Sequence, residues 1–208
     1  MRKLVFLMLV VIIVGTLYIV KSITKPNYNS ILNFFGTSTN VQTQPININP
    51  DFTLTDVNGK IVTNNDFLGK IMLVYFGFTY CPDICPAELN VIGAALEKLG
   101  EDADKVQALF ITVDPERDDF AQLKSYMEHF NTKIIALNGT LEETEIVAKN
   151  YKVYYNKIAG QGDGKNYLID HSSLIYLIDT KGNFNSVFYA KATADDIALK
   201  LKQLITNN

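Results

Sequence analysis

The feature that most restricts the fold is a pair of predominantly apolar runs: residues 71–76 are uninterrupted, and residues 106–113 are broken only by Gln107 and Thr112. Each run has the length of a strand, and a run without alternation is typical of a central strand covered on both faces. Between the runs, residues 86–99 carry leucine and isoleucine at helical spacing and are followed by Gly100, a common helix terminator. Two buried strands joined by a helix predict a β-α-β unit, and therefore an α/β fold.

The other predicted elements extend this unit on both sides. An Asn58-Gly59 turn indicates a hairpin before the first buried strand, and the turn at 180–183 indicates a second hairpin near the C-terminus. The order β-α-β, then β-β, then a final helix is that of a thioredoxin-like fold, with a mixed sheet and helices on both faces. Apart from the runs above, we expect strands at 52–56, 61–62, 134–137, 173–179 and 184–189, and helices at 118–130, 141–151 and 194–205.

The N-terminal segment is apolar enough to be a candidate membrane-spanning helix. Residues 4–20 contain no charged side chain, and the length of this run is at the short end of what a membrane-spanning helix needs. Two basic residues stand on each side of it. We interpret residues 1–23 as an uncleaved single transmembrane anchor, because no small-x-small cleavage site follows; a cleaved signal peptide and a buried helix are the alternatives. Residues 24–49, rich in Asn, Ser, Thr, Gln and Pro, are the predicted linker, and residues 50–208 the predicted domain.

The charged residues bear on location and on partners. Arg2 and Lys3 favour a cytoplasmic N-terminus and a domain outside, by the positive-inside rule. An arginine-rich mitochondrial presequence has no room before the apolar run, so we expect a bacterial inner membrane with the domain in the periplasm; the mitochondrial inner membrane is less favoured. Beyond residue 25, 15 basic side chains stand against 22 acidic ones, which argues against nucleic-acid binding.

Both cysteines of the chain fall in the segment that leaves the first buried strand and enters the helix. Cys81 and Cys85 are four positions apart, so one helical turn would bring both sulfurs to the same face. A helix N-terminus favours the thiolate, which is the form that binds metals and attacks disulfides. The pair can therefore chelate a metal ion or close a disulfide; an inert core pair and a purely structural disulfide are the alternatives.

His171 is the imidazole that we expect at the same site. It precedes the buried strand at 173–179, whose start faces the cysteine-bearing turn in a thioredoxin-like fold, and no proline follows Pro115 to act as the cis-proline of thioredoxins. His129 is interpreted as a surface or boundary residue. Two thiolates and one imidazole favour copper, as Cu(I) or Cu(II), over zinc and exclude calcium and magnesium. Asp170 should point to the other side of an extended strand, so it is a candidate for tuning the site without ligating the metal.

Three blocks of sequence resemble the Sco/SenC family of copper proteins. They are GFTYCPDICPAEL at 77–89, VDPERD at 113–118 and YLIDHS at 167–172. The resemblance implies a membrane-anchored thioredoxin-like domain that binds copper through Cys81, Cys85 and His171. It further implies a role in building the dinuclear copper centre of cytochrome c oxidase, with the copper-bearing subunit of that enzyme as partner. A copper donor chaperone is a further candidate partner, and the sequence leaves the donor open.

Three functions compete for this site. A metallochaperone, which is not an enzyme, needs all three ligands, whereas a thiol–disulfide oxidoreductase that reduces the oxidase's cysteines needs only the dithiol. A thiol peroxidase of the same fold is the least favoured. We expect the metallochaperone, because the spacing is CxxxC instead of CxxC and the chain contains no tryptophan. In the second block, we expect Asp114 or Asp118 to cap the following helix and Arg117 to pair with a carboxylate.

Overall fold

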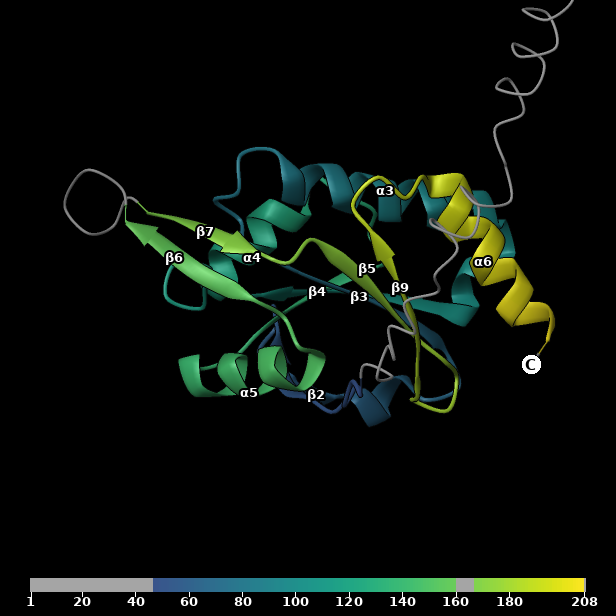
Figure 1. Ribbon diagram of the computed structural model, residues 1–208, viewed down its shortest axis with the longest axis horizontal. Coiled ribbons are helices and arrows are strands. Elements are labelled where there is room, and N and C mark those ends of the chain that lie inside the picture. The colour runs from purple at the N-terminus through teal and green to yellow at the C-terminus, as the bar shows by residue number, and fades with distance from the viewer. Residues whose placement is uncertain (1–46, 160–166, 208) are drawn as a thin grey trace, which may run out of the picture. The chain divides into compact units, whose positions relative to one another are not determined.

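Seven strands form the central sheet, in the order β2-β1-β5-β4-β3-β8-β9. The computed structural model describes residues 47–159 and 167–207, and Figure 1 shows this sheet with its helices. β3, β4 and β5 run parallel, whereas β1 and β8 are antiparallel to their neighbours, so the sheet is mixed as predicted. The strands are β1 (Thr53–Asp56), β2 (Ile61–Thr63), β3 (Ile71–Gly77), β4 (Val106–Thr112), β5 (Ile134–Asn138), β8 (Leu174–Ile178) and β9 (Phe184–Tyr189).

Helices cover both faces of the sheet (Figure 1). α3 (Ile84–Leu99) and α6 (Ala194–Thr206) pack against each other on one side, together with α4 (Phe120–Met127), and α5 (Leu141–Tyr151) lies on the opposite side. Two 3-10 helices complete the connections, η1 (Asn64–Phe67) after β2 and η2 (Gly100–Lys105) after α3. The predicted arrangement of a mixed sheet flanked by helices is confirmed.

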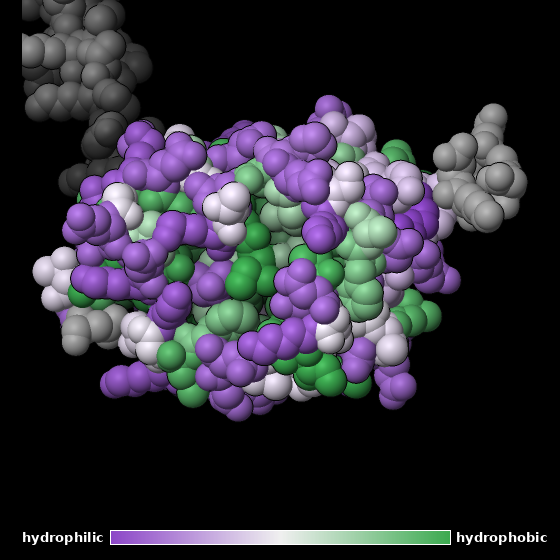
Figure 2. All heavy atoms as spheres, turned by 180° about the vertical axis from the view of Figure 1, so that it is seen from behind, coloured by the Kyte–Doolittle hydropathy of each residue, from purple (hydrophilic) through white to green (hydrophobic). Residues whose placement is uncertain are grey.

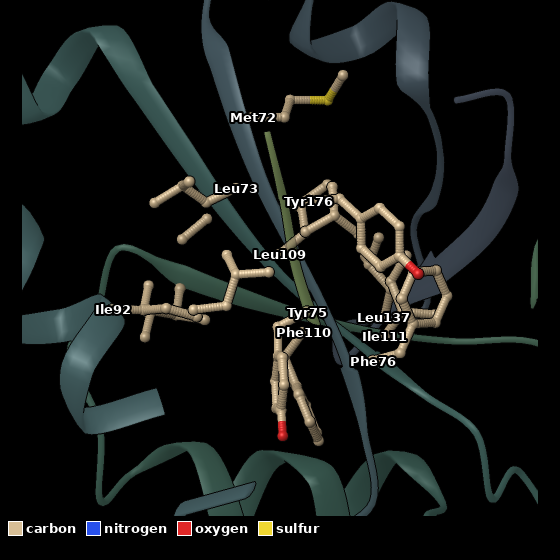
Figure 3. Close-up of a cluster of buried hydrophobic side chains, with 14 of the residues drawn as sticks. Met72, Leu73, Tyr75, Phe76, Ile92, Leu109, Phe110, Ile111, Leu137 and Tyr176 are labelled. Carbon is tan, nitrogen blue, oxygen red and sulfur yellow. The ribbon is translucent and has the colours of Figure 1, made fainter. Parts of the chain in front are cut away.

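The core lies where β3 and β4 are covered on both faces. All seven residues of β3 are buried, as the unbroken apolar run predicts. On the α3 side, Tyr75 stacks on Phe110 with 6.2 Å between ring centroids (Figure 3). On the α5 side, the ring centroids of Phe76 and Tyr151 are 5.1 Å apart. Burying each such side chain stabilises the folded state by about 1.5–3 kcal/mol. This layer therefore fixes β3 firmly beneath the segment that follows it.

The first hairpin forms as its Asn-Gly turn predicts. Gly59 adopts a φ of +82°, a left-handed conformation that glycine accepts without strain. The carboxylate of Asp56 accepts hydrogen bonds from two backbone N–H groups of the turn, at 2.8 and 2.9 Å. This turn sets the register that pairs Leu54 with Val62, and both side chains are buried in the core.

One pair of strands was not predicted from the sequence. β6 (Tyr155–Ala159) and β7 (Tyr167–His171) form a separate two-stranded sheet. Ile158 and Leu168 pair across it and are each 52% exposed, so the apolar residues of this pair do not follow the alternation of a half-buried strand. β7 nevertheless matters for function, because its last residue is His171.

α4 begins and ends inside the predicted range of 118–130. Asp119 is its N-cap and accepts a hydrogen bond from the backbone N–H of Gln122 at 2.8 Å, so the helix starts at Phe120. After the helix, the chain forms a turn in which His129 is exposed, as predicted. The prediction that Asp114 or Asp118 caps this helix is wrong, because Asp119 fills that role.

The surface mixes polar and apolar residues. Figure 2 shows hydrophobic patches set among hydrophilic residues on one face, which is usual for a folded domain. Within residues 47–159 and 167–207, no helix has the length and apolar composition needed to cross a membrane. The predicted anchor at 1–23, and the predicted linker up to residue 46, lie outside the described residues.

Candidate metal centre

The connection from β3 to α3 carries both cysteines. β3 ends at Gly77 and α3 begins at Ile84, which places Cys81 in the loop and Cys85 in the first turn of the helix. The backbone N–H of Cys85 donates to Cys81 Sγ at 3.4 Å. Cys85 is fully buried, Cys81 is half-buried, and both are free thiols. The two sulfurs therefore meet at one helix N-terminus, as their spacing predicts, and Cys81 is the one that reaches solvent.

His171, the last residue of β7, lies against the two sulfurs. Its Nε2 is 3.4 Å from Cys85 Sγ, and the three candidate ligand atoms all lie within 4.8 Å of one another. Its Nδ1 is 3.2 Å from the carbonyl oxygen of Ser172. A carbonyl oxygen only accepts, so this contact assigns the ring proton to Nδ1 and leaves the lone pair of Nε2 directed at the sulfurs. The structure thus brings the three predicted ligands together.

Aromatic rings hold the imidazole in this orientation. The ring of Phe78 meets His171 edge-on with centroids 5.8 Å apart, and Tyr75 does so at 6.3 Å. Both aromatic residues are buried. The imidazole is therefore packed between the end of β3 and the cysteine loop, and does not swing freely into solvent.

The pKa values of the two thiols are shifted in opposite directions. Hydrogen bonding from Cys85 lowers the pKa of the Cys81 thiol well below its ordinary value. The same pairing, together with burial, raises the pKa of the Cys85 thiol. In the metal-free pair these opposite shifts favour the thiolate at Cys81 and the protonated thiol at Cys85. A thiolate is the form required both for metal binding and for disulfide exchange.

Gly77 is required by the site although it offers no ligand atom. A Cβ at this position would lie 2.8 Å from Cys85 Sγ and 2.8 Å from Cε2 of Phe110. Both neighbours are fully buried in a close-packed interior, so neither can move away freely. The glycine stands in the first sequence block, but its role becomes visible only when the fold brings Cys85 against it.

A buried carboxylate lies behind the cysteine loop. Asp118 is fully buried and accepts hydrogen bonds from Thr79 N–H at 3.0 Å, Thr79 Oγ1 at 2.6 Å and Thr112 Oγ1 at 2.6 Å. Burial raises the pKa of Asp118, and these three hydrogen bonds oppose that rise. Because its carboxylate is directed at Thr79, Asp118 does not cap α4.

Arg117 pairs with a carboxylate, as predicted. Its Nε donates to Asp114 Oδ2 at 2.5 Å, and its Nη1 donates to the backbone oxygen of Tyr167 at 2.9 Å. The guanidinium carbon also lies 3.5 Å from the centroid of the Tyr167 ring, within the range of a cation–π contact. Sequence reasoning missed Thr79 and Tyr167, since no local pattern links either residue to this loop.

Asp170 lies apart from the ligand atoms. It is exposed, it pairs in register with Asn156 of β6, and its neighbour His171 directs Nδ1 to Ser172 instead of to the Asp170 carboxylate. Adjacent residues of a strand face opposite sides, which accounts for this arrangement. An influence of the Asp170 charge on the metal centre therefore stays a prediction.

The chemistry of the donor atoms decides which metals fit. Two sulfurs and one imidazole nitrogen suit copper and zinc, whereas calcium and magnesium need oxygen ligands. Structural zinc normally takes four protein ligands. Across residues 47–159 and 167–207, Cys81, Cys85 and His171 are the only such group of ligand atoms that the structure brings together. A set of three soft and borderline ligands fits copper better than a closed zinc site.

Fold and site together define a thioredoxin-like protein with a dithiol–imidazole centre. The SCO1/SenC family model matches residues 40–206, and the chain belongs to that family. The resemblance carried by the three sequence blocks is thereby confirmed. Relatives include a SCO2-like protein of Rickettsia felis, 36% identical over 200 residues that cover 96% of this chain and 95% of the relative. Protein sco1 of Schizosaccharomyces pombe is 44% identical over 149 residues, which cover 71% of this chain and 57% of the relative.

Solved structures show the same fold. ScoI of Bradyrhizobium japonicum with copper bound is 43% identical, with a TM-score of 0.71 and coverage of 76% of this chain and 99% of that protein. Yeast Sco1 with copper bound is 36% identical, with a TM-score of 0.70 and coverage of 76% of this chain and 88% of that protein. BsSco, a member of the Sco family of cytochrome c oxidase assembly proteins in which a disulfide switch is identified, is 27% identical, with a TM-score of 0.62 and coverage of 79% and 97%.

Proposed function

We propose that this chain is a copper metallochaperone, which holds a copper ion through Cys81, Cys85 and His171 and takes part in assembling the dinuclear copper centre of cytochrome c oxidase. The observation that carries the proposal is the direction of His171 Nε2, 3.4 Å from Cys85 Sγ, while Nδ1 faces the carbonyl of Ser172. A dithiol enzyme does not need an imidazole lone pair at this place. The copper-bound relatives support copper as the cargo.

The surroundings of the site suit delivery to a protein. A three-ligand site leaves the copper ion open to a ligand of the partner, so the ion can pass across without first being released. Tyr80 and Ile84 flank Cys81 and are 51% and 52% exposed, which gives the site an apolar rim. The proposed acceptor is the copper-bearing subunit of the oxidase, and the proposed source is a copper donor chaperone.

The test is copper binding by the full chain after reduction, measured by competition with a chromophoric Cu(I) chelator. We expect one copper per wild-type chain, and a loss of at least about 100-fold in affinity for Cys81→Ser, Cys85→Ser and His171→Ala. His129→Ala is the matched control, because this other histidine is exposed and should leave binding unchanged. Equal, weak binding by the wild type and His171→Ala would overturn the proposal.

A thiol–disulfide oxidoreductase that reduces the cysteines of the oxidase copper site is the second candidate, favoured by the unequal thiols. The Cys81 thiolate would attack a disulfide of the partner and form a mixed disulfide. The Cys85 thiol would then lose its proton and attack the Cys81 sulfur, which releases the partner as a dithiol and leaves a Cys81–Cys85 disulfide. In an exchange assay with a small disulfide, this function requires His171→Ala to remain active and Cys81→Ser to lose activity.

The proposal includes a location. Residues 1–23 anchor the chain, residues 24–49 are the linker, and the domain of residues 50–208 lies in the periplasm of a bacterium. The uncharged run at 4–20 and the rickettsial relatives support this assignment. After alkaline carbonate extraction we expect the chain in the membrane pellet, and in spheroplasts we expect added protease to digest the domain. Recovery of the chain in the carbonate supernatant would contradict the anchor.

A further inference from the structure

The ligands of the proposed centre come from two parts of the fold that are not paired with each other. Cys81 and Cys85 belong to the β3–α3 connection, whereas His171 belongs to the small β6–β7 sheet, which shares no ladder with the central sheet. Residues 112–118, which we call the clamp loop, lie between them. This loop leaves the end of β4 and contacts both ligand-bearing segments.

The first contact runs from the clamp loop to the cysteine loop. Asp118 accepts hydrogen bonds from both the backbone N–H and the hydroxyl of Thr79, which stands two positions before Cys81. The hydroxyl of Thr79 in turn accepts from Gln122 Nε2 at 3.0 Å, and Thr112 Oγ1 donates to the same carboxylate. Asp118 is fully buried and Thr79 is 8% exposed, so water does not compete strongly for these bonds.

The second contact runs from the clamp loop to the strand that carries the histidine. The hydroxyl of Tyr167 donates to Asp114 Oδ1 at 2.5 Å, while Arg117 bonds both Asp114 and the backbone oxygen of Tyr167. Tyr167 opens β7 and His171 closes it. The two residues are four positions apart and therefore lie on the same face of the strand. Fixing Tyr167 thus fixes the place from which the imidazole projects.

We propose that the clamp loop sets the separation between the cysteine sulfurs and His171 Nε2, with Asp118 acting through Thr79 and with Asp114 and Arg117 acting through Tyr167 as positioning residues. This inference rests on the proposed function, because it assigns the loop a role in holding copper. None of these residues supplies a ligand atom. Their effect adds to the pairing of β3 with β8, which already brings the cysteine loop and the end of β7 to the same edge of the sheet.

The most direct test of the contact between Asp118 and Thr79 compares the variants Thr79→Val and Thr79→Ser in the full chain. Valine keeps the shape but removes the hydroxyl that bonds Asp118, and serine restores that hydroxyl. We expect Thr79→Val to lose about tenfold in Cu(I) affinity, measured by chelator competition, and Thr79→Ser to stay close to the wild type. Co(II) serves as the optical probe, and Thr79→Val should shift the sulfur-to-Co(II) charge-transfer band.

Tyr167→Phe tests the other contact, since it removes the hydroxyl that bonds Asp114 and keeps the ring stacked on Arg117. We expect a similar loss of Cu(I) affinity, with the ligand-field bands of Co(II) altered. Ile178→Val is the control for stability, because Ile178 is buried at the end of β8 that pairs with Met72, away from the site. This variant should be destabilised and still bind copper as the wild type does.

The outcomes separate the two proposals. Wild-type affinity and spectrum in both Thr79→Val and Tyr167→Phe would overturn the positioning role and leave the metallochaperone intact. An equal loss of affinity in Ile178→Val would also overturn it, because the effect would then follow from stability alone. Copper binding by the wild type no stronger than by Cys81→Ser would overturn the proposed function, and the positioning role with it.

Discussion

At Gly77 the backbone of β3 passes so close to Cys85 that a hydrogen atom is the only substituent the space accepts. The residue does not lie in the left-handed region, in contrast to Gly59, so its need for glycine comes from the neighbouring atoms and not from its backbone conformation. The atoms in the way are a candidate ligand sulfur and the ring of Phe110. Space at this one position therefore connects the core to the metal centre.

Replacing Gly77 by alanine should damage stability and binding together. The added methyl group overpacks the interior, at a cost of about 1–3 kcal/mol in the free energy of unfolding, and displaces Cys85 Sγ. We expect at least about a tenfold loss of Cu(I) affinity. Urea unfolding and chelator competition measure the two effects. Val74→Ala is the control: Val74 is buried in the same strand, and its truncation should lower stability but keep affinity.

The inequality of the two thiols leads to a second prediction. At pH 6, iodoacetamide should modify Cys81 in the folded, metal-free chain and leave Cys85 unmodified, because the pKa of Cys81 is lowered and that of buried Cys85 is raised. Mass spectrometry of the alkylated peptides measures this. Cys85→Ser, which keeps a hydrogen-bond donor, should preserve the reactivity of Cys81 better than Cys85→Ala. Equal rates at the two cysteines of the wild type would contradict this account.

The same shifts define a pH dependence of folding. A thiol whose pKa is lowered in the folded state stabilises the fold at pH values above its unfolded pKa, and this contribution disappears as the pH falls through the folded pKa. Cys85 behaves in the opposite sense, since its raised pKa favours the fold at lower pH. Cys81→Ser should therefore flatten the dependence of urea midpoints on pH below the ordinary thiol range.

Among the α-helices of residues 47–159 and 167–207, α3 differs from the others in how its N-terminus is satisfied. α4, α5 and α6 have side-chain N-caps, at Asp119, Thr140 and Thr193. α3 has no side-chain cap of this kind, and the sulfur of Cys81 accepts the Cys85 N–H instead. The start of this helix is thus occupied by a group that also serves as a candidate ligand.

The cap of α5 should matter for stability alone. Thr140 and Glu143 form a reciprocal capping box, with hydrogen bonds of 3.2 and 2.7 Å. Removing the hydroxyl in Thr140→Ala should cost about 1 kcal/mol in the free energy of unfolding, while Thr140→Ser should cost much less. Copper affinity should be the same in both variants, since α5 covers the face of the sheet opposite α3 (Figure 1).

The elements predicted from the sequence are those with a strong local pattern. β3 shows as an unbroken apolar run, and α5 has the same bounds as predicted, because its period and its cap are both local. The proximity of the candidate ligands was predictable because two cysteines stand at a strand-to-helix junction. Asp118 and Tyr167 were not, since their partners lie 39 and 53 positions away and only the fold brings them together.

At the scale of the whole molecule, the proposed copper ion joins segments from both halves of the domain. An ion that binds only the folded chain stabilises it by mass action, by about 2.7 kcal/mol when free copper exceeds Kd a hundredfold. Cu(I) should therefore raise the melting temperature of the reduced wild type, and His171→Ala should lose most of that increase. Calorimetry with and without Cu(I) measures both. The same increase in the two proteins would show that His171 does not hold the ion.

The distance along the chain between Cys85 and His171 has a consequence for biosynthesis. The two residues are 86 positions apart. A ribosome adding about 5–20 residues per second therefore produces the histidine roughly 4–17 s after the cysteine. During that interval the growing polypeptide offers the dithiol but not yet the imidazole of His171. The complete site arises only after β7 has been synthesised and has docked, so a chain that can carry copper is one whose translation and folding are nearly finished.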